Sequence, residues 1–180
     1  MRWMWIDQII ELVPGTRMVA IKNVSLAEEH LHEHFAATDD LPALPVCPAS
    51  LIIEGMAQTA GILVGSTRDF KEKVILAKIG RAGLDADVFP GQTIRFEAEL
   101  QHIDDSGAGT AGVVSRTEPG SGRWEVIGHI DLLFSHADRN MAGLDLPEHN
   151  FVFGDNLKII LQTAGLADRA TQKTKNGPVR

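Results

Sequence analysis

The sequence predicts an α+β domain in which an antiparallel sheet curls around one long helix. Residues 48–65 are apolar on almost every side and include no lysine or arginine, which is typical of a helix buried on most faces. About five runs with strand-like composition, separated by turn sequences, occupy much of residues 17–134. Because so apolar a helix cannot lie exposed on a flat sheet, we expect the sheet to wrap around it.

The N-terminal elements are predicted from spacing and turns. Apolar residues recur at helical spacing between Trp5 and Leu12, just before Pro14-Gly15, so we expect a short amphipathic helix there. Residues 17–24 follow this turn and predict a strand. Residues 30–38 fit no single element, and 39–45, which include two prolines, predict a loop.

Strand-like segments and turns fill the rest of the main domain, which we place at residues 1–135. The strands are expected at 74–79, 94–100, 110–116 and 124–134. Residues 136–180 form a C-terminal extension with a different character. There, Asp155 is expected to cap a helix over 156–166, and 171–180 are expected to be disordered. The apolar face of this helix consists of Leu157, Ile160, Leu161 and Ala164.

Composition excludes several classes of function. The 180-residue chain carries a net charge of −7, which argues against a surface for nucleic acid or anionic membrane. Its one cysteine, Cys47, allows no internal disulfide and no metal site built on cysteine pairs, and fits a reducing cytoplasm. Asp7 and Glu11 interrupt the apolar N-terminal run, so we expect neither a signal peptide nor a membrane span.

Three segments resemble bacterial 3-hydroxyacyl-acyl-carrier-protein dehydratases. Residues 23–35, NVSLAEEHLHEHF, resemble the strand and loop that carry the catalytic histidine of that family. Residues 45–61, PVCPASLIIEGMAQTAG, resemble its central helix, and 88–100, VFPGQTIRFEAEL, resemble the strand after its Pro-Gly turn. With WIDQIIELVP, the likeness covers roughly residues 5–135. It implies the hotdog fold and the conversion of (3R)-hydroxyacyl chains on acyl carrier protein to trans-2-enoyl chains.

The resemblance also implies roles for individual residues. His34 matches the catalytic base and Glu54 the catalytic acid, while the backbone N–H of Ala49, reached through Cys47 and Pro48, would meet the thioester oxygen. A histidine with a pKa of ~6.5 suits proton abstraction, and burial would keep Glu54 protonated. Gln58, one turn after Glu54, is expected to be structural. No metal or other cofactor is required.

The family works as dimers or as trimers of dimers, and each site combines the histidine of one protomer with the glutamate of the other. The acyl carrier protein is the expected partner. Basic residues after the central helix are the candidates for docking it, although they are equally typical of a solvated turn. These candidates are Arg68, Lys71, Lys73, Lys78 and Arg81.

The chain departs from the family pattern at four points. Glu33, Ala36 and Ala49 replace the usual Gly, Pro and Gly. His34 and Glu54 are 54 − 34 = 20 residues apart, about six more than usual, which an outward loop can absorb. These departures favour one alternative, a degenerate relative that only binds acyl chains or acyl carrier protein. A second alternative, a hotdog acyl thioesterase in which Glu54 or His34 activates water, also stays open.

Other roles for the site residues, most of them structural, stay open as well. The alternate histidines His30, His32 and His34 would lie on one side of a strand, where they suit either a metal or the solvent. Glu54 would be a solvent-facing residue if the sheet left a gap beside it. Cys47 has the chemistry of a nucleophile, but a buried cysteine more often serves as a small hydrophobe.

Overall fold

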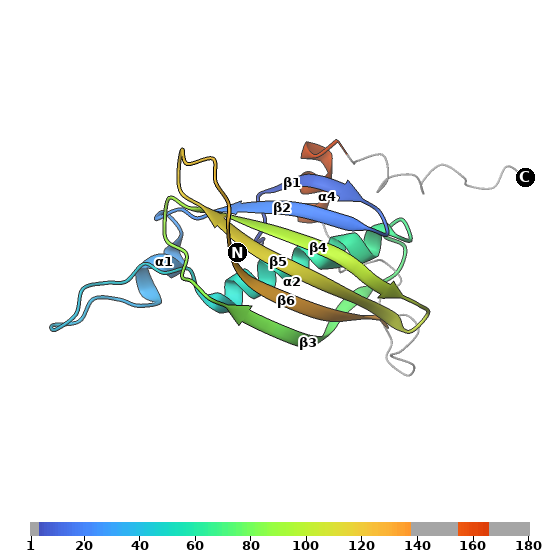
Figure 1. The fold of residues 1–180 in the computed structure, drawn as a ribbon, viewed down its shortest axis with the longest axis horizontal. Helices are drawn as coiled ribbons and strands as arrows, with labels where there is room; N and C mark the ends of the chain where they lie inside the picture. The colour runs from blue at the N-terminus through green and yellow to red at the C-terminus, as the bar shows by residue number, and fades with distance from the viewer. Residues whose placement is uncertain (1–3, 138–154, 166–180) are drawn as a thin grey trace, which may run out of the picture.

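A six-stranded antiparallel sheet curls around the long helix α2 in the computed structural model, which describes residues 4–137 and 155–165 (Figure 1). The strand order is β1-β2-β4-β5-β6-β3, and every pairing is antiparallel. The strands are β1 Gln8–Val13, β2 Arg17–Asn23, β3 Val74–Leu84, β4 Thr93–Ile103, β5 Gly107–Thr117 and β6 Glu125–His136. The described helices are α1 Glu29–Glu33, α2 Ala49–Ser66 and α4 Asp155–Thr163. The predicted hotdog architecture is confirmed, with six strands instead of about five.

Helix α2 forms the centre of the core. It packs on β2, β3, β4, β5 and β6, and Figure 1 shows it crossing behind the sheet. Met56, Ala60 and Leu63 are completely buried along it, and their neighbours on the sheet include Phe96, which is 1% exposed. By length and composition α2 is the one described helix that qualifies as a membrane span, but 61% of it is buried inside the fold. The all-round apolarity of this segment therefore reflects its enclosure by the sheet.

The helix predicted for residues 5–12 is wrong, because Gln8–Val13 form strand β1. A β-bulge explains the error. Ile9 pairs with Ala20 and Leu12 pairs with Met18, and the register shifts between Ile9 and Glu11. The extra residue places Ile9 and Leu12 on the same face although they are three positions apart. Such spacing in a bulged strand imitates the period of a helix.

Strand β3 lies at one edge of the sheet and is exposed over most of its length. Leu76 and Ile79 pair with Phe134 and Leu132 of β6, whose side chains are buried on the inner face of the sheet. Leu76 and Ile79 are nevertheless 37% and 45% exposed. The inner face therefore continues to this edge with apolar side chains that a single chain leaves uncovered.

The C-terminal helix α4, Asp155–Thr163, ends three residues earlier than predicted and contacts β1. Ile160 and Leu161 are buried in the core, and Ala164 packs against it. This part of the predicted apolar face is confirmed. The side chain of Leu157 and the predicted disordered segment 171–180 lie outside the described residues.

Candidate active site

The N-terminus of α2 is anchored to the sheet but open to solvent. The N–H of Cys47 donates to Val88 O at 2.8 Å, and Pro48 serves as the N-cap with an extended ψ of 133°. Ala49, the first residue of the helix, is exposed. The first N–H groups of a helix lack intrahelical acceptors and lie at the positive end of its dipole. The backbone at Ala49 is therefore suited to bind a carbonyl oxygen.

Cys47 is buried beside this N-terminus. The residue is 7% exposed, and burial, with a smaller contribution from Glu28, raises the pKa of its thiol to about 11. A thiol with this pKa stays protonated near neutral pH, which argues against a nucleophile. The geometry favours the role of a small hydrophobe that fixes the chain before Pro48.

Glu54 projects from the second turn of α2 and is half-buried. Its Oε1 accepts a hydrogen bond from Nε2 of Gln58 at 2.9 Å. The Oε1 of Gln58 in turn accepts a hydrogen bond from the backbone N–H of Trp5 at 2.9 Å. Gln58 therefore connects the carboxyl group of Glu54 to the segment before β1. Sequence reasoning missed Trp5, since every residue except proline carries a backbone donor and no motif marks this one.

His34 directly follows helix α1 and caps its C-terminus. Its N–H donates to His30 O at 3.1 Å, and its ring makes an edge contact with Phe35 at a centroid distance of 4.4 Å. The imidazole is exposed. His30, His32 and His34 do not share one side of a strand, as the metal-binding alternative required, because the first two lie on a helix, on which alternate residues point in different directions. Among residues 4–137 and 155–165, no group of acidic, cysteine or histidine side chains is arranged to hold a metal ion.

The two residues predicted as base and acid are not joined within one chain. Within the described part of the chain, neither a hydrogen bond nor an ion pair connects His34 to Glu54. His34 follows α1, whereas Glu54 lies on α2. His34 has an exposed ring, while Glu54 has one carboxylate oxygen bonded to Gln58.

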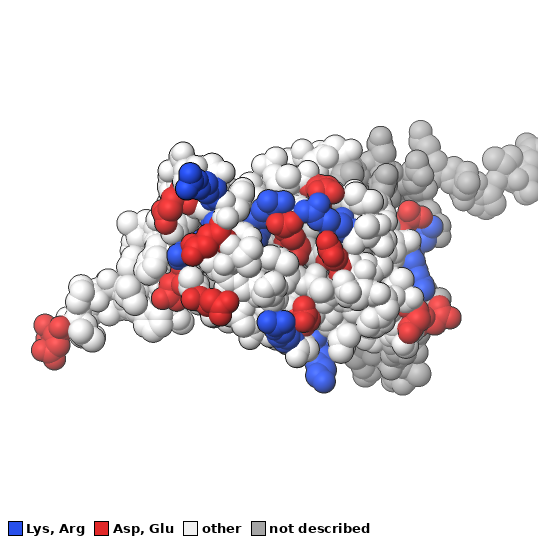
Figure 2. Space-filling view, in the orientation of Figure 1, with Lys and Arg blue, Asp and Glu red and all other residues white. Residues whose placement is uncertain are grey.

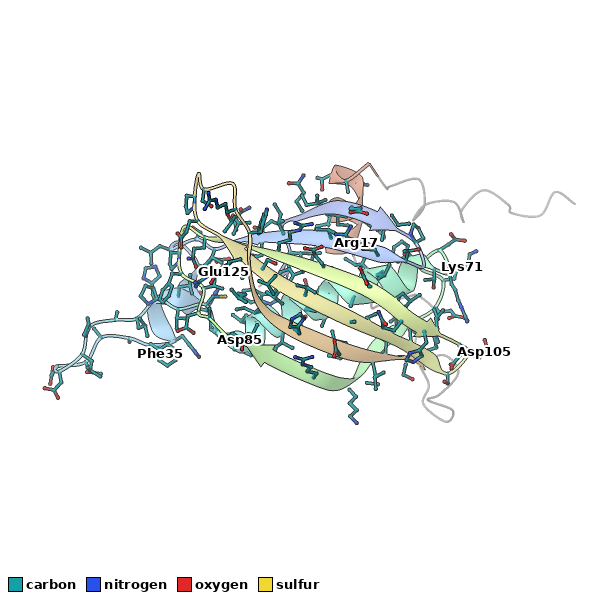
Figure 3. The ribbon with its side chains drawn as sticks, viewed as in Figure 1. Arg17, Phe35, Lys71, Asp85, Asp105 and Glu125 are labelled. Atoms are coloured by element: carbon teal, nitrogen blue, oxygen red, sulfur yellow. The ribbon has the colours of Figure 1, made fainter. Side chains whose placement is uncertain are left out.

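The basic residues predicted for carrier docking occupy two places. Arg68, Lys71 and Lys73 follow the C-terminus of α2. By the rise of the helix, this end lies about 26 Å from Ala49. Figure 3 shows Lys71 and Phe35 at opposite ends of the molecule. Lys78 and Arg81 lie on β3 instead, where both are exposed.

The residues after α2 are already engaged. Arg68 pairs with Glu72 at 2.7 Å and Asp105 at 3.4 Å, Lys71 pairs with Asp69 at 2.9 Å, and Lys73 is buried. Figure 2 shows basic and acidic side chains interspersed over the outer face of the sheet.

Comparisons with known proteins identify the family. The family described as FabA-like domain matches residues 2–117, more than half of the chain. The chain belongs to the FabA-like family. This chain is also similar to curated relatives named 3-hydroxyacyl-acyl-carrier-protein dehydratase FabZ. The relative from Ruminiclostridium cellulolyticum is 40% identical over 53% of this chain and 63% of its own length. The relative from Clostridium kluyveri is 36% identical over 59% of this chain and 72% of its own length.

The alignment with the first of these relatives thus spans a little under two thirds of that protein. Among solved structures, the dehydratase heterocomplex ApeI:P from Xenorhabdus doucetiae has a chain that superposes with a TM-score of 0.53 at 17% identity. The superposition covers 74% of this chain and 83% of the other. At this identity the likeness supports the fold of the FabA-like chain alone.

Proposed function

We propose that this chain removes water from (3R)-hydroxyacyl groups carried on acyl carrier protein and forms trans-2-enoyl groups. Membership of the FabA-like family and the names of the similar curated relatives support this function. The observation that carries the proposal is the half-buried carboxyl group of Glu54, held by Gln58 on an otherwise apolar helix. A carboxylic acid placed this way can donate a proton to a leaving hydroxyl group.

The proposed chemistry needs three groups from the protein. His34 takes a proton from C2 of the acyl chain, and the electron pair forms the C2–C3 double bond. The protonated Glu54 donates its proton to the hydroxyl group at C3, which leaves as water. The backbone N–H of Ala49 stabilises the charge that develops on the thioester oxygen. Proton transfer from His34 back to Glu54, directly or through water, restores the enzyme.

We propose that the working unit is a homodimer, alone or as a trimer of dimers, in which His34 of one protomer meets Glu54 of the other. The exposed ring of His34 and the exposed edge of β3 support this assembly. A second copy paired along β3 would satisfy the free backbone groups of the edge and cover Leu76 and Ile79.

In the same assembly, cations on β3 are better placed than those after α2 to attract an acidic carrier protein. Lys78 and Arg81 pair with Leu133 and Asp131 of β6, which alternate with the buried residues of that strand. Both cations therefore project from the outer face of the sheet, where long-range attraction to a charged partner operates. We also propose a cytoplasmic location, where the free thiol of Cys47 would stay reduced.

One assay separates the proposed dehydratase from a thioesterase and from a binding protein. The purified chain is incubated with 3-hydroxybutyryl and crotonyl thioesters, and both enoyl absorbance and free thiol are followed. Interconversion of the hydroxyacyl and enoyl forms supports the dehydratase. Thiol release without interconversion would indicate a thioesterase instead. If neither reaction occurs, with these thioesters or with substrate on acyl carrier protein, the chain is a protein that only binds.

The shared site is tested by complementation. Neither His34→Ala nor Glu54→Ala should be active alone, because each variant lacks one residue in both sites. When the two variants are unfolded, mixed equally and refolded, about half of the dimers are mixed and each regains one of two sites, so activity should approach about a quarter of wild type. Wild-type protein taken through the same procedure is the control. Activity that stays at background while wild type recovers contradicts the shared site.

A further inference from the structure

The amide of Gln58 is oriented by the backbone of Trp5. A glutamine side chain has one oxygen that accepts and one NH₂ group that donates hydrogen bonds. Because the N–H of Trp5 donates to Oε1 of Gln58, the NH₂ group must point the other way, towards Oε1 of Glu54. A rotated amide would place two oxygens against each other at the carboxyl group. The Trp5 peptide therefore selects the orientation in which Gln58 donates to Glu54.

The Trp5 peptide lies directly on α2. The carbonyl oxygen of Trp5 is 3.0 Å from the position that a Cβ atom would take at Gly55, the residue after Glu54. The strand hydrogen bonds of β1 begin only later, with the N–H of Asp7 donating to Ile21 O at 2.8 Å. Trp5 thus precedes the part of the N-terminal segment that the sheet fixes, and its position depends on its own contacts.

His30 supplies one of those contacts. Its imidazole packs against the indole of Trp5 with a centroid distance of 5.0 Å and an interplanar angle of 73°, the edge-to-face arrangement that aromatic rings favour. Within the described residues, Nε2 of His30 is buried and has no hydrogen-bond partner. The contact between the two rings is therefore a packing contact, and the hydrogen-bonding capacity of the imidazole does not explain it.

We propose that His30 is a positioning residue whose ring holds Trp5 on α2, so that the Trp5 N–H fixes the Gln58 amide and, through it, the carboxyl group of Glu54. This inference rests on the proposed function, in which Glu54 protonates the leaving hydroxyl group. His30 acts through Trp5 and Gln58 and does not touch the substrate. Its surroundings favour a neutral ring, because burial and, to a smaller extent, Lys22 and His34 lower its pKa, while Glu28 raises it.

A structural measurement tests the packing step without any need for activity. Amide hydrogen exchange at Trp5 is compared by NMR in wild type, His30→Ala and His30→Phe, with His32→Ala as the control from the exposed side of α1. Loss of the ring in His30→Ala should speed exchange at the Trp5 N–H about tenfold, whereas His30→Phe should stay within about threefold of wild type. Unchanged exchange at Trp5 in folded His30→Ala overturns the proposal, as does faster exchange in His30→Phe equal to that in His30→Ala.

A kinetic measurement tests the consequence for Glu54. With a small 3-hydroxyacyl thioester, His30→Ala should lower kcat about tenfold and leave KM unchanged, because the acid is misplaced only at the chemical step. His30→Phe should restore kcat, which a role in hydrogen bonding would not allow. Equal kcat in His30→Ala and wild type overturns the proposal. If wild type itself shows no dehydration, the proposed function fails, and the exchange measurement still decides whether His30 holds Trp5.

Discussion

The substitution Gly55→Ala tests how tightly α2 fits its sheet. A Cβ atom at Gly55 would lie 2.4 and 2.7 Å from two ring atoms of Phe96, and 3.0 Å from the carbonyl oxygen of Trp5. Phe96 is 1% exposed, so its ring has little freedom to move away. Overpacking of this kind costs about 1–3 kcal/mol. The higher helix propensity of alanine returns about 0.5–1 kcal/mol.

The net effect should lower the free energy of unfolding by about 0–2.5 kcal/mol, or the Tm by up to roughly 10 °C for a chain of this size. Thermal unfolding and urea denaturation provide the measurement. Gly61→Ala is the matched control on the same helix, because its nearest neighbour is Cε1 of Phe134 at 3.6 Å, an ordinary contact. This control should gain about 0.5–1 kcal/mol from helix propensity alone.

Phe96→Leu provides a second check on the same contact. If the clash lies with the ring, Phe96→Leu should cost less in the Gly55→Ala background than in wild type, with a coupling of at least about 0.5 kcal/mol. Equal stabilisation of Gly55→Ala and Gly61→Ala would refute the steric argument. It would mean that α2 can shift on the sheet without cost, and that Glu54 and Gln58 are held less firmly than their hydrogen bonds suggest.

The remaining predictions concern a thiol, an imidazole and a pair of surface cations. Burial raises the pKa of Cys47 to about 11, from 9.0 for an exposed thiol, so the thiolate is about 100-fold scarcer in the folded protein than in the unfolded chain. Alkylation of Cys47 by iodoacetamide at pH 8 should therefore be at least about 100-fold slower in the folded protein than in urea. Equal rates would contradict the burial. Burial also lowers the pKa of His30 below 6.5, so the unfolded chain binds more protons below that pH. The free energy of unfolding of wild type should therefore fall relative to that of His30→Phe as the pH is lowered below 6.5. Parallel curves of stability against pH for the two proteins would contradict a lowered pKa. Reversal of Lys78 and Arg81 to Glu should raise KM for the carrier-bound substrate, in a salt-sensitive way, and leave KM for a small thioester unchanged, with Lys71→Glu as the comparison. An equal rise for both substrates would rule out docking.

The central helix was predictable from sequence because its composition has only one structural solution. A segment with apolar residues on every side, in which the polar side chains are Ser50, Glu54, Gln58 and Thr59, is stable only when other elements enclose it. The sheet around it followed from alternation and turns. The strand β1 was not predictable, because the bulge after Ile9 changes the period on which such predictions depend.

The candidate site was only partly predictable. Glu54 and His34 were predicted from the resemblance of short motifs. Such motifs give the type of each residue but not the residues that contact it in the folded chain. The links from Glu54 to Gln58 and Trp5 cross 53 positions of sequence and end at a backbone atom. The contact of His30 with Trp5 depends on a five-residue helix, which is too short to leave a periodic pattern.

Helix α1 has a consequence for how the two halves of the proposed dimer would communicate. It carries His30, and its C-cap residue is His34, whose N–H donates to His30 O. In the proposed assembly, His34 serves the site on the partner, whereas His30 supports Glu54 of its own chain. A single displacement of α1 would therefore withdraw the base from one site and loosen the acid of the other. Binding of substrate at one site would therefore change activity at the second site, and cooperative kinetics would be the expected observation.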